Sequence, residues 1–384
     1  MRRRTPVAPG GTLGILGGGQ LGRMTALAAR AMGYRVAVLD PTPEPPASPV
    51  ADQVFTAPFH DAEAAARLAR ACDVVTLEIE QIAPAALAAA AAEAPLAPRP
   101  GAIEIVQQRD VQKAWLAEQG LPVGPFRRAA SAEQIAAAVR ELGGRCFVKA
   151  RFGGYDGRGQ AELDDPAGAG EAFAAIGGQP AIVERELARE REISVLVARR
   201  PGGEAVAYPP AWNHHERRIL AWSALPAPLP EPMARRAGEL ALAAAERLDL
   251  VGLLCVEMFL VGGELLVNEL APRPHNSYHA SERACATSQF EQLVRAVCDL
   301  PLGSPEILRP AAIANLLGDL WREGAPPDWA AALEVPGVSL HLYGKREARP
   351  GRKMGHLSAV GDSPEQAAER VRLAFARLVG GQPT

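Results

Sequence analysis

The sequence predicts an α/β protein of two or three domains, on three observations. The chain has 384 residues, too many for one ordinary domain. Residues 12–93 alternate short apolar runs with alanine-rich helical stretches, a rhythm typical of a parallel sheet covered by helices. From about residue 190 the apolar runs lengthen into a strand-rich pattern, with long helical segments before and after its most apolar part.

Composition excludes several classes of protein. Hydrophobic residues make up 48% of the chain, but no segment reaches the roughly 18 consecutive apolar residues of a membrane helix. The net charge of −3 gives no electrostatic basis for nucleic acid or a membrane surface as the main partner. The five cysteines are scattered and form no C-x-x-C pair, which predicts a reduced, cytoplasmic protein. The arginine-rich start, residues 1–11, is expected to be a disordered extension rather than an export signal.

The first unit carries a glycine motif. Gly17, Gly19 and Gly22 satisfy G-x-G-x-x-G after an apolar stretch, and Asp40 ends a second strand. This is the dinucleotide fingerprint, so an NAD-dependent dehydrogenase is one interpretation. That interpretation leaves the carboxylates and the second glycine loop described below without a purpose. Prolines in residues 94–101 end the unit.

The second unit begins with a helix over residues 110–119 and a second helix opened by a Ser131–Gln134 capping box. The strand "RCFVKA" then ends near Lys149, and four glycines follow within ten residues. Glycines let backbone amides approach an anion, and lysine supplies a point charge, so this loop is either a phosphate-binding loop or a plain mobile turn. The chain has four lysines, Lys113, Lys149, Lys345 and Lys353, so each is expected to meet a specific chemical need.

The third unit contains "LLCVEMFLVGGELLVNEL", whose two apolar arms around Gly262 and Gly263 predict a β-hairpin. A three-residue turn centred on Gly263 places Glu257 opposite Glu269. Facing, half-buried carboxylates need a cation between them, and oxygen ligands without His or Cys favour Mg²⁺. Asn268 would add a neutral oxygen ligand. The alternative is that an arginine such as Arg273 neutralises the pair.

Two polar loops and the closing elements complete the chain. The segment "NELAPRPHNSYHAS" follows a buried strand and is dense in donors and acceptors, which suggests substrate binding. The segment "GKREARPGRK" is either a solvated basic loop or a phosphate-ester site. A helix is expected over residues 282–298, and a closing helix is expected to start at Ser363 and Pro364.

Five segments in this order, "GILGGGQLGRM", "EIEQI", "GGYDGRGQ", "NELAPRPHNS" and "RPGRKMGHL", resemble the ATP-grasp superfamily. Within it they resemble the family of N5-carboxyaminoimidazole ribonucleotide synthases. The resemblance covers nearly the whole chain from Gly11. The chain departs from the family pattern at Tyr278, where glycine is usual, and at Phe152, where arginine is common.

The resemblance implies a fold and a reaction. The fold is a disordered extension (1–11), a Rossmann-like pre-ATP-grasp domain (12–108), a small lid domain (109–189) and a larger ATP-grasp domain with the last substrate-binding strands (190–384). The reaction is the ATP- and bicarbonate-dependent carboxylation of 5-aminoimidazole ribonucleotide through carboxyphosphate, releasing ADP and phosphate, in purine (IMP) biosynthesis. A homodimer that passes its product to the mutase of the same pathway is also implied. Alternatives are formate-dependent glycinamide ribonucleotide transformylase, biotin carboxylase, or a non-catalytic nucleotide sensor.

The resemblance also assigns residues. In this family the first glycine loop holds no dinucleotide but borders the ribonucleotide, and its amides give it anion affinity. The ATP contacts would be Arg109, Lys149, Gly153, Gly154, Tyr155, Asp156, Gly157, Arg158, Gly159, Gln160, Glu184, Arg185, Glu186, Leu187, Glu192, His215, Asn268 and Glu269. Mg²⁺ would lie on Glu257 and Glu269. The ribonucleotide and bicarbonate contacts would be Gln20, Leu21, Glu78, Tyr155, Arg273, His275, Asn276, Lys345, Arg352 and Lys353. The catalytic set would be Asp156, His275, Arg273 and Lys353, with Asp156 or His275 managing the proton.

Overall fold

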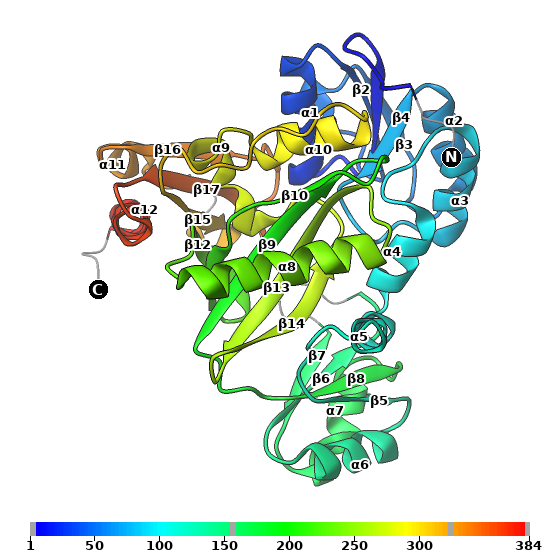
Figure 1. Cartoon of the computed structure of the whole chain (residues 1–384), viewed down its shortest axis with the longest axis vertical. Helices are drawn as coiled ribbons and strands as arrows, with labels where there is room; N and C mark the ends of the chain where they lie inside the picture. Colours follow the sequence, from blue (N-terminus) through cyan, green and yellow to red (C-terminus); the bar gives the residue numbers. More distant parts are fainter. Residues whose placement is uncertain (1–4, 154–158, 322–325, 381–384) are drawn as a thin grey trace.

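The structure is a computed structural model, which describes residues 5–153, 159–321 and 326–380 (Figure 1). Its strands form three sheets that follow one another along the chain. The first contains β1 to β4, the second β5 to β8, and the third β9 to β17. No helix in these ranges is long and apolar enough to cross a membrane. Helices and strands both occur along the whole chain, which confirms the predicted α/β class.

The first sheet is parallel, as the alternating pattern predicts, and its strands lie in the order β3-β2-β1-β4. Helices α1, α2 and α3 connect or follow its strands, and their alanine-rich faces pack into its apolar core. The bounds are β1 (Thr12–Leu16), α1 (Gln20–Ala31), β2 (Arg35–Asp40), β3 (Gln53–Thr56), α2 (Ala62–Arg70), β4 (Val74–Leu77) and α3 (Pro84–Glu93).

Residues 7–11 differ from the disorder expected of them. The amide of Val7 donates to the Cys298 carbonyl at 2.9 Å. The Tyr34 hydroxyl donates to the Val7 carbonyl at 2.6 Å. Sequence alone missed this because the anchoring groups lie in distant elements. This segment therefore connects the residue before β2 to the end of α10.

The second sheet is small and antiparallel, in the order β5-β8-β6-β7. Helix α6 begins as predicted, since the Ser131 hydroxyl accepts from the Gln134 amide. The Gln134 side chain accepts instead from the Ala130 amide, so the capping box is completed one residue early. The bounds are β5 (Phe126–Ala129), α6 (Ala132–Leu142), β6 (Cys146–Ala150), β7 (Gln160–Leu163), α7 (Ala169–Ala175) and β8 (Ala181–Arg185).

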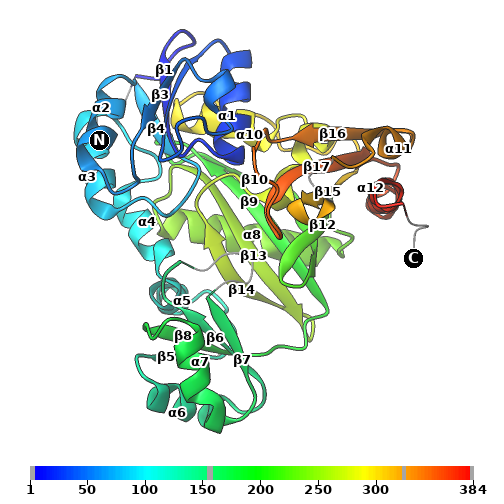
Figure 2. The same cartoon turned by 180° about the vertical axis from the view of Figure 1, so that it is seen from behind.

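The third sheet has the order β14-β13-β9-β11-β12-β15-β17-β16, with β10 beside β9. Helix α8 lies across one part of it and α12 across another (Figures 1 and 2). The bounds are β9 (Arg191–Arg199), β10 (Ala205–Ala207), β11 (Ala211–Glu216), β12 (Ile219–Leu225), α8 (Glu231–Arg247), β13 (Gly252–Val261), β14 (Glu264–Ala271), β15 (Ala311–Leu317), α11 (Trp329–Leu333), β16 (Val338–Leu342), β17 (Lys353–Val360) and α12 (Pro364–Leu378).

The prediction of one continuous helix over residues 282–298 is wrong. The structure has two helices there, α9 (Ser281–Ala284) and α10 (Gln289–Val297). The Ser288 side chain accepts from the Glu291 amide and so starts a new helix, while Cys285 pairs with Ile307 as a β-bridge. The closing helix does start at Ser363, whose side chain accepts from the Gln366 amide, with Pro364 in its first turn.

Two helices join the sheets. Helix α4 (Pro100–Gln107) leads into α5 (Arg109–Glu118), which lies at the junction between the small sheet and the β13–β14 hairpin in both views (Figures 1 and 2). The carbonyl of Pro122, just after α5, accepts from the Val267 amide of β14 at 2.7 Å. The Arg109 amide donates to the Arg151 carbonyl at 3.2 Å. Helix α5 is therefore fixed to both neighbours at once.

Candidate active site

The glycine loop between β1 and α1 already holds an anion of the protein itself. The Gly19 amide donates to Glu78 Oε1 at 2.5 Å, and the Gly22 amide donates to Glu78 Oε2 at 2.7 Å. The Gly18 amide donates to Asp40 Oδ2 at 2.9 Å. These are the amides that a phosphate would use at a helix N-terminus.

The three motif glycines serve this close approach. A Cβ atom at Gly17 or Gly19 would collide with the Glu78 side chain, and one at Gly22 would collide with the Gly17 carbonyl. The fingerprint therefore fits a carboxylate in this chain, because Glu78 takes the place of a pyrophosphate. This observation disfavours the NAD-dependent dehydrogenase.

The hairpin pairs Glu257 with Glu269, as predicted. The turn is shorter than predicted, because Gly262 and Gly263 form a two-residue turn with φ values of 57° and 79°. Such a turn alone would pair Glu257 with Asn268. A bulge next to Met258 adds one residue to β14 and moves Glu269 into that place. The predicted turn length was wrong, and the bulge restores the predicted pair.

Cations near the two carboxylates are arranged unevenly. His275 Nε2 lies 3.1 Å from Glu257 Oε1. Burial opposes the charged ring, but Cys255 and Glu257 raise the pKa of His275 to about 10. The Glu257 carboxylate is likewise desolvated, yet His275 lowers its pKa to about 2. These values describe a charged pair.

The other carboxylate has a different environment. Desolvation by the surrounding protein, together with the charge of Glu257, raises the pKa of Glu269 although solvent still reaches it. Arg273 is not its partner, because its Nε lies 2.8 Å from Glu80 Oε1. The ion pair of Arg273 is therefore with Glu80, although its charge still reaches Glu269. The pair retains a place for a cation.

The lid contributes a second set of charges. Lys149, at the end of β6, lies 2.5 Å from Glu184 Oε2 at the end of β8. Beyond it, Glu192 Oε2 lies 2.5 Å from His215 Nδ1, which brings β9 and β11 together. The charge of Arg109 reaches Glu269 and moderates its raised pKa. The structure thus brings these predicted nucleotide residues around the hairpin.

The remaining predicted lid residues lie at the end of β8, directly after it, or beside the glycine loop between β6 and β7. Arg185 and Glu186 are exposed, and Leu187 contacts Gly124. Gly153 and Gly159 have positive φ, and Gln160 pairs with Lys149 across β6 and β7. Five predicted residues lie outside the described ranges: Gly154, Tyr155, Asp156, Gly157 and Arg158.

The predicted ribonucleotide contacts converge from both ends of the chain. Lys345 Nζ donates to Gln20 Oε1 at 2.5 Å and to the Lys353 carbonyl at 2.6 Å. The charge of Lys345 reaches Glu78, and that of Lys353 reaches Glu257. Arg352 donates to the Glu347 carbonyl at 2.9 Å. These basic residues therefore connect the glycine loop to the hairpin.

Leu21 and Asn276 differ in what they offer a ligand. The Leu21 side chain is buried in an apolar cluster with Met24 and Tyr343, so any ligand contact from Leu21 would come from its backbone. Asn276 is 7% exposed, and neither polar atom of its side chain has a hydrogen-bond partner among the described residues. An unpartnered buried amide is costly unless a ligand completes it.

The two departures from the family pattern lie in different surroundings. Tyr278 is fully buried, and its hydroxyl lies 2.9 Å from the carbonyls of Ser194 and Pro209. It packs edge-on against Tyr208 and so fills the core. Phe152 is 49% exposed, and its amide donates to Gln179 Oε1 at 3.2 Å.

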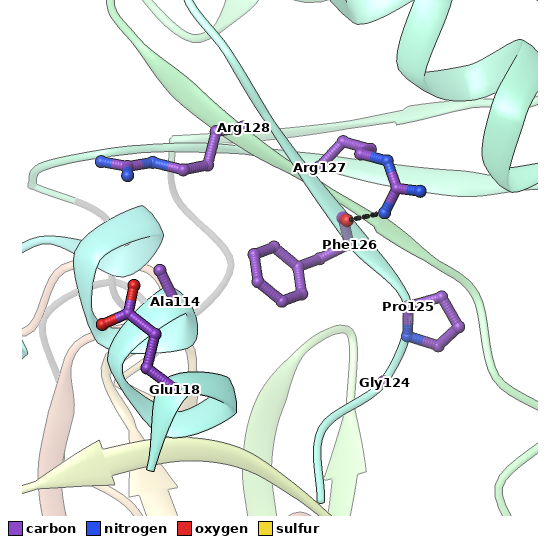
Figure 3. Close-up of a pocket in the computed structure, with 7 residues that line it drawn as sticks. All are labelled: Ala114, Glu118, Gly124, Pro125, Phe126, Arg127 and Arg128. Carbon is purple, nitrogen blue, oxygen red and sulfur yellow. Dashed lines mark hydrogen bonds between the residues drawn. The ribbon is translucent and has the colours of Figure 1, made fainter. Parts of the chain in front are cut away.

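Two hollows lie near the lid. One, of about 320 Å³, lies between the first domain and the lid, and its lining includes Phe59, Glu80, Gln107 and Phe152. The other, of about 540 Å³, is an open groove between α5 and the segment before β5 (Figure 3). Its lining residues are Ala114, Glu118, Gly124, Pro125, Phe126, Arg127 and Arg128, and none belongs to the predicted site.

Sequence reasoning missed two residues that hold the site together. Ser277 Oγ lies 2.8 Å from His275 Nδ1 and 2.8 Å from Ser194 Oγ, so it links the imidazole to the buried core. Lys113 is buried and contacts both the lid and the hairpin. The scarcity of lysine was a signal for Lys113, but nothing in the sequence indicated its partners.

Comparisons with known proteins agree with this geometry. Three families match in order: the ribonucleotide synthetase preATP-grasp domain over residues 11–107, the ATP-grasp domain over 114–290, and the phosphoribosylaminoimidazole carboxylase C-terminal domain over 311–370.

Individual relatives extend over the whole chain. N5-carboxyaminoimidazole ribonucleotide synthase of Brucella melitensis is 44% identical over 93% of this chain and 98% of its own length. A crystal structure of an N5-carboxyaminoimidazole ribonucleotide synthetase with ADP is 40% identical, with a TM-score of 0.91 over 97% of this chain and 98% of that one. The Aspergillus clavatus enzyme with ADP and 5-aminoimidazole ribonucleotide is 33% identical, with a TM-score of 0.88 over 96% and 98%.

Proposed function

Because this chain belongs to the family of N5-carboxyaminoimidazole ribonucleotide synthases, we propose that it is the ATP-dependent ligase that carboxylates 5-aminoimidazole ribonucleotide in purine biosynthesis. Bicarbonate is the carboxyl source, carboxyphosphate is the intermediate, and ADP and phosphate leave. The alternative transformylase has no observation in its favour here.

The facing pair of Glu257 and Glu269 carries this proposal. One carboxylate is paired with His275, whereas the other has a raised pKa and lies within reach of the charge of Arg109. This donor set suits Mg²⁺, which binds one or two carboxylates together with substrate phosphates. When bound, Mg²⁺ supplies positive charge to the phosphate oxygens of ATP. Asn268 would be a further oxygen ligand.

The chain's own cations stabilise phosphoryl transfer. Lys149 and Arg109 lie beside the hairpin, where negative charge on the transferring phosphoryl group is held. The segment at the end of β8, Glu184–Leu187, would border the adenine and ribose together with the Glu192–His215 pair. Residues 153–160 would close over the phosphates.

The ribonucleotide is held between the glycine loop and the last strands. Gln20, Lys345, Lys353, Arg352 and Asn276 would supply its polar contacts, with Leu21 and Glu78 at the loop. Arg273 would reach bicarbonate or the ribonucleotide from its place beside Glu80.

His275 is suited to one role in proton transfer. In its charged form it would donate a hydrogen bond to an oxygen of the activated carboxylate, while another group accepts the amine proton. The base that accepts this proton is Asp156 in our proposal. The cleft formed by the lid would exclude water and so protect carboxyphosphate from hydrolysis.

The proposal extends to the setting of the enzyme. We place it in the cytoplasm as a homodimer whose product passes to the mutase of the same pathway. The domain division at residues 12, 109 and 190 is also part of the proposal. It is supported by the three sheets, which fall within those limits.

ADP release is the test. It is measured with ATP, Mg²⁺ and bicarbonate, with and without 5-aminoimidazole ribonucleotide. We expect release that needs the ribonucleotide and is lost in Glu269→Ala. Release that the ribonucleotide does not stimulate would overturn the substrate and leave the ATP-grasp assignment in place.

A further inference from the structure

Lys113 is a buried lysine to which neither the sequence pattern nor the resemblance assigns a role. It lies on α5, and its side chain is 7% exposed. Its Nζ lies 2.7 Å from Glu184 Oε1 of the lid and 2.7 Å from the Asn268 carbonyl of the hairpin. A lysine ammonium has three donors, so both contacts form at once.

The carbonyl that Lys113 uses is available because of the bulge. Asn268 is the extra residue of β14 in the β13–β14 ladder. An extra residue leaves the regular pairing of the ladder, so its backbone groups need other partners. Lys113 therefore anchors the residue directly before Glu269.

Glu184 is shared between two lysines. Its Oε1 contacts Lys113, and its Oε2 contacts Lys149 at 2.5 Å. The Glu184 side chain is 13% exposed, and the two lysines overcome its desolvation and lower its pKa strongly. Lys149 is the lysine proposed to meet the phosphates of ATP. A phosphate and Glu184 therefore compete for the same ammonium group.

We propose that Lys113 is a positioning residue that stays on Glu184 as its counter-ion and so releases Lys149 to the phosphates of ATP. Without Lys113, a departing Lys149 would leave a buried carboxylate unpaired, which is strongly unfavourable. Glu184 would then retain Lys149 and weaken the binding of nucleotide. This inference rests on the proposed function, because it takes ATP as the ligand of Lys149.

The rest of α5 explains why Lys113 stays in place. Gln112, its neighbour in the chain, accepts from the Leu270 amide at 2.9 Å and donates to the Leu270 carbonyl at 3.4 Å. Asp110 lies 2.8 Å from Arg151 at the end of β6. The helix is thus held by the hairpin on one side and by the lid on the other.

The test measures nucleotide binding without turnover. The dissociation constants of Mg²⁺-ATP are determined by calorimetry, with bicarbonate and ribonucleotide omitted, for wild type, Lys113→Met, Glu184→Gln and the double variant. We expect Lys113→Met to weaken binding at least tenfold. We expect the same Lys113 change to weaken binding less than twofold when Glu184 is already Gln, because the competing carboxylate is gone.

Controls separate this role from a structural one. Arg140→Met removes an exposed cation from α6 and is expected to bind ATP as wild type does. Lys113→Arg keeps the charge and is expected to recover part of the affinity. If Lys113→Met does not fold, Lys113→Gln with and without Glu184→Gln gives the same comparison.

Two outcomes overturn the inference. One is a folded Lys113→Met that binds ATP within threefold of wild type. The other is a Lys113→Met change that weakens binding as much in the Glu184→Gln background as in wild type, which would show that Lys113 supports only the hairpin. A wild-type chain that binds ATP but does not carboxylate the ribonucleotide would defeat the proposed function and leave this inference standing.

Discussion

The glycine loop of the first domain and the β13–β14 hairpin both present carboxylates, but they neutralise them in different ways. In the loop, burial raises the pKa of Glu78, and two backbone amides donate to its carboxylate and oppose that rise. In the hairpin, Glu257 has His275 beside it, while Glu269 faces Glu257 and has a raised pKa. The Gly19 and Gly22 amides are therefore already occupied, whereas the hairpin offers two facing carboxylates to an outside cation.

This difference shows why the same residue type has opposite roles. A motif describes which groups a loop can offer, but the partner that reaches those groups decides what they bind. Glu78 comes from the strand beside β1, and no local pattern around Gly17 predicts its arrival. The predictions below alter the partner on one side or the other, from the largest expected effect to the smallest.

Glu269→Gln is expected to lower the turnover number by about 10³-fold, because it removes a charge that holds the phosphoryl-transfer site together. The fold is expected to persist, since the change also removes the repulsion from Glu257. Steady-state ADP release and a thermal unfolding scan check the two parts. A variant that retains more than a tenth of wild-type turnover would exclude Glu269 as the metal carboxylate.

Glu78→Ala is expected to cost about 2–4 kcal/mol of unfolding free energy, because it leaves two amide donors without their charged acceptor. It also opens the loop, so inorganic phosphate should raise the melting temperature of the variant more than that of wild type. Denaturant unfolding with and without phosphate measures both effects. Glu63→Gln, an exposed residue of α2, is the matched control. Equal phosphate responses would contradict the idea that Glu78 occupies an anion site.

Asn276→Ala is expected to raise the KM for the ribonucleotide about tenfold, the loss of one hydrogen-bonding group or two. The KM for ATP and the melting temperature should barely change, because the amide has no partner among the described residues. Kinetics with each substrate varied in turn give the two constants. A marked fall in melting temperature would mean that Asn276 is a structural residue.

The pH dependence of stability without Mg²⁺ gives the smallest effect. The pKa of Glu269 is raised above its ordinary 4.5, so its contribution to stability is fully present below pH 4.5 and is lost as pH rises through the raised value. Wild type should therefore lose about 1–2 °C relative to Glu269→Gln across that window. Mg²⁺ at neutral pH should restore the melting temperature that wild type has lost. Parallel curves for the two proteins, without Mg²⁺, would contradict the repulsion between Glu257 and Glu269.

The sequence predicted most of what depends on local pattern. The parallel strands of the first sheet and the cap of α6 at Ser131 follow from periodicity and capping residues. The pairing of Glu257 with Glu269 was predicted with the wrong turn and depends on the bulge. Contacts between distant elements were beyond this reasoning. The partners of Glu78, of Lys113 and of the Tyr278 hydroxyl lie 56 or more residues away in the chain.

The glycine fingerprint shows the limit most clearly. Gly17 and Gly19 are glycines because a side chain approaches closely, which is the physical reason that the pattern contains glycine at all. The pattern does not indicate whether the group that approaches the glycines belongs to the protein or to a ligand. Two signals pointed away from a dinucleotide: the family resemblance, and the carboxylates and second glycine loop that a dehydrogenase would leave without a purpose. The structure supplies the reason.

The bulge at Asn268 has a consequence for how the hairpin varies in length. A three-residue turn without a bulge and a two-residue turn with one both place Glu257 across from Glu269. An insertion at the tip is therefore compatible with a deletion at position 268, and the two carboxylates stay on one face. Relatives that make this exchange would align with two separate gaps yet keep the same metal pair. Their lysine at position 113 would lose the carbonyl that now anchors it.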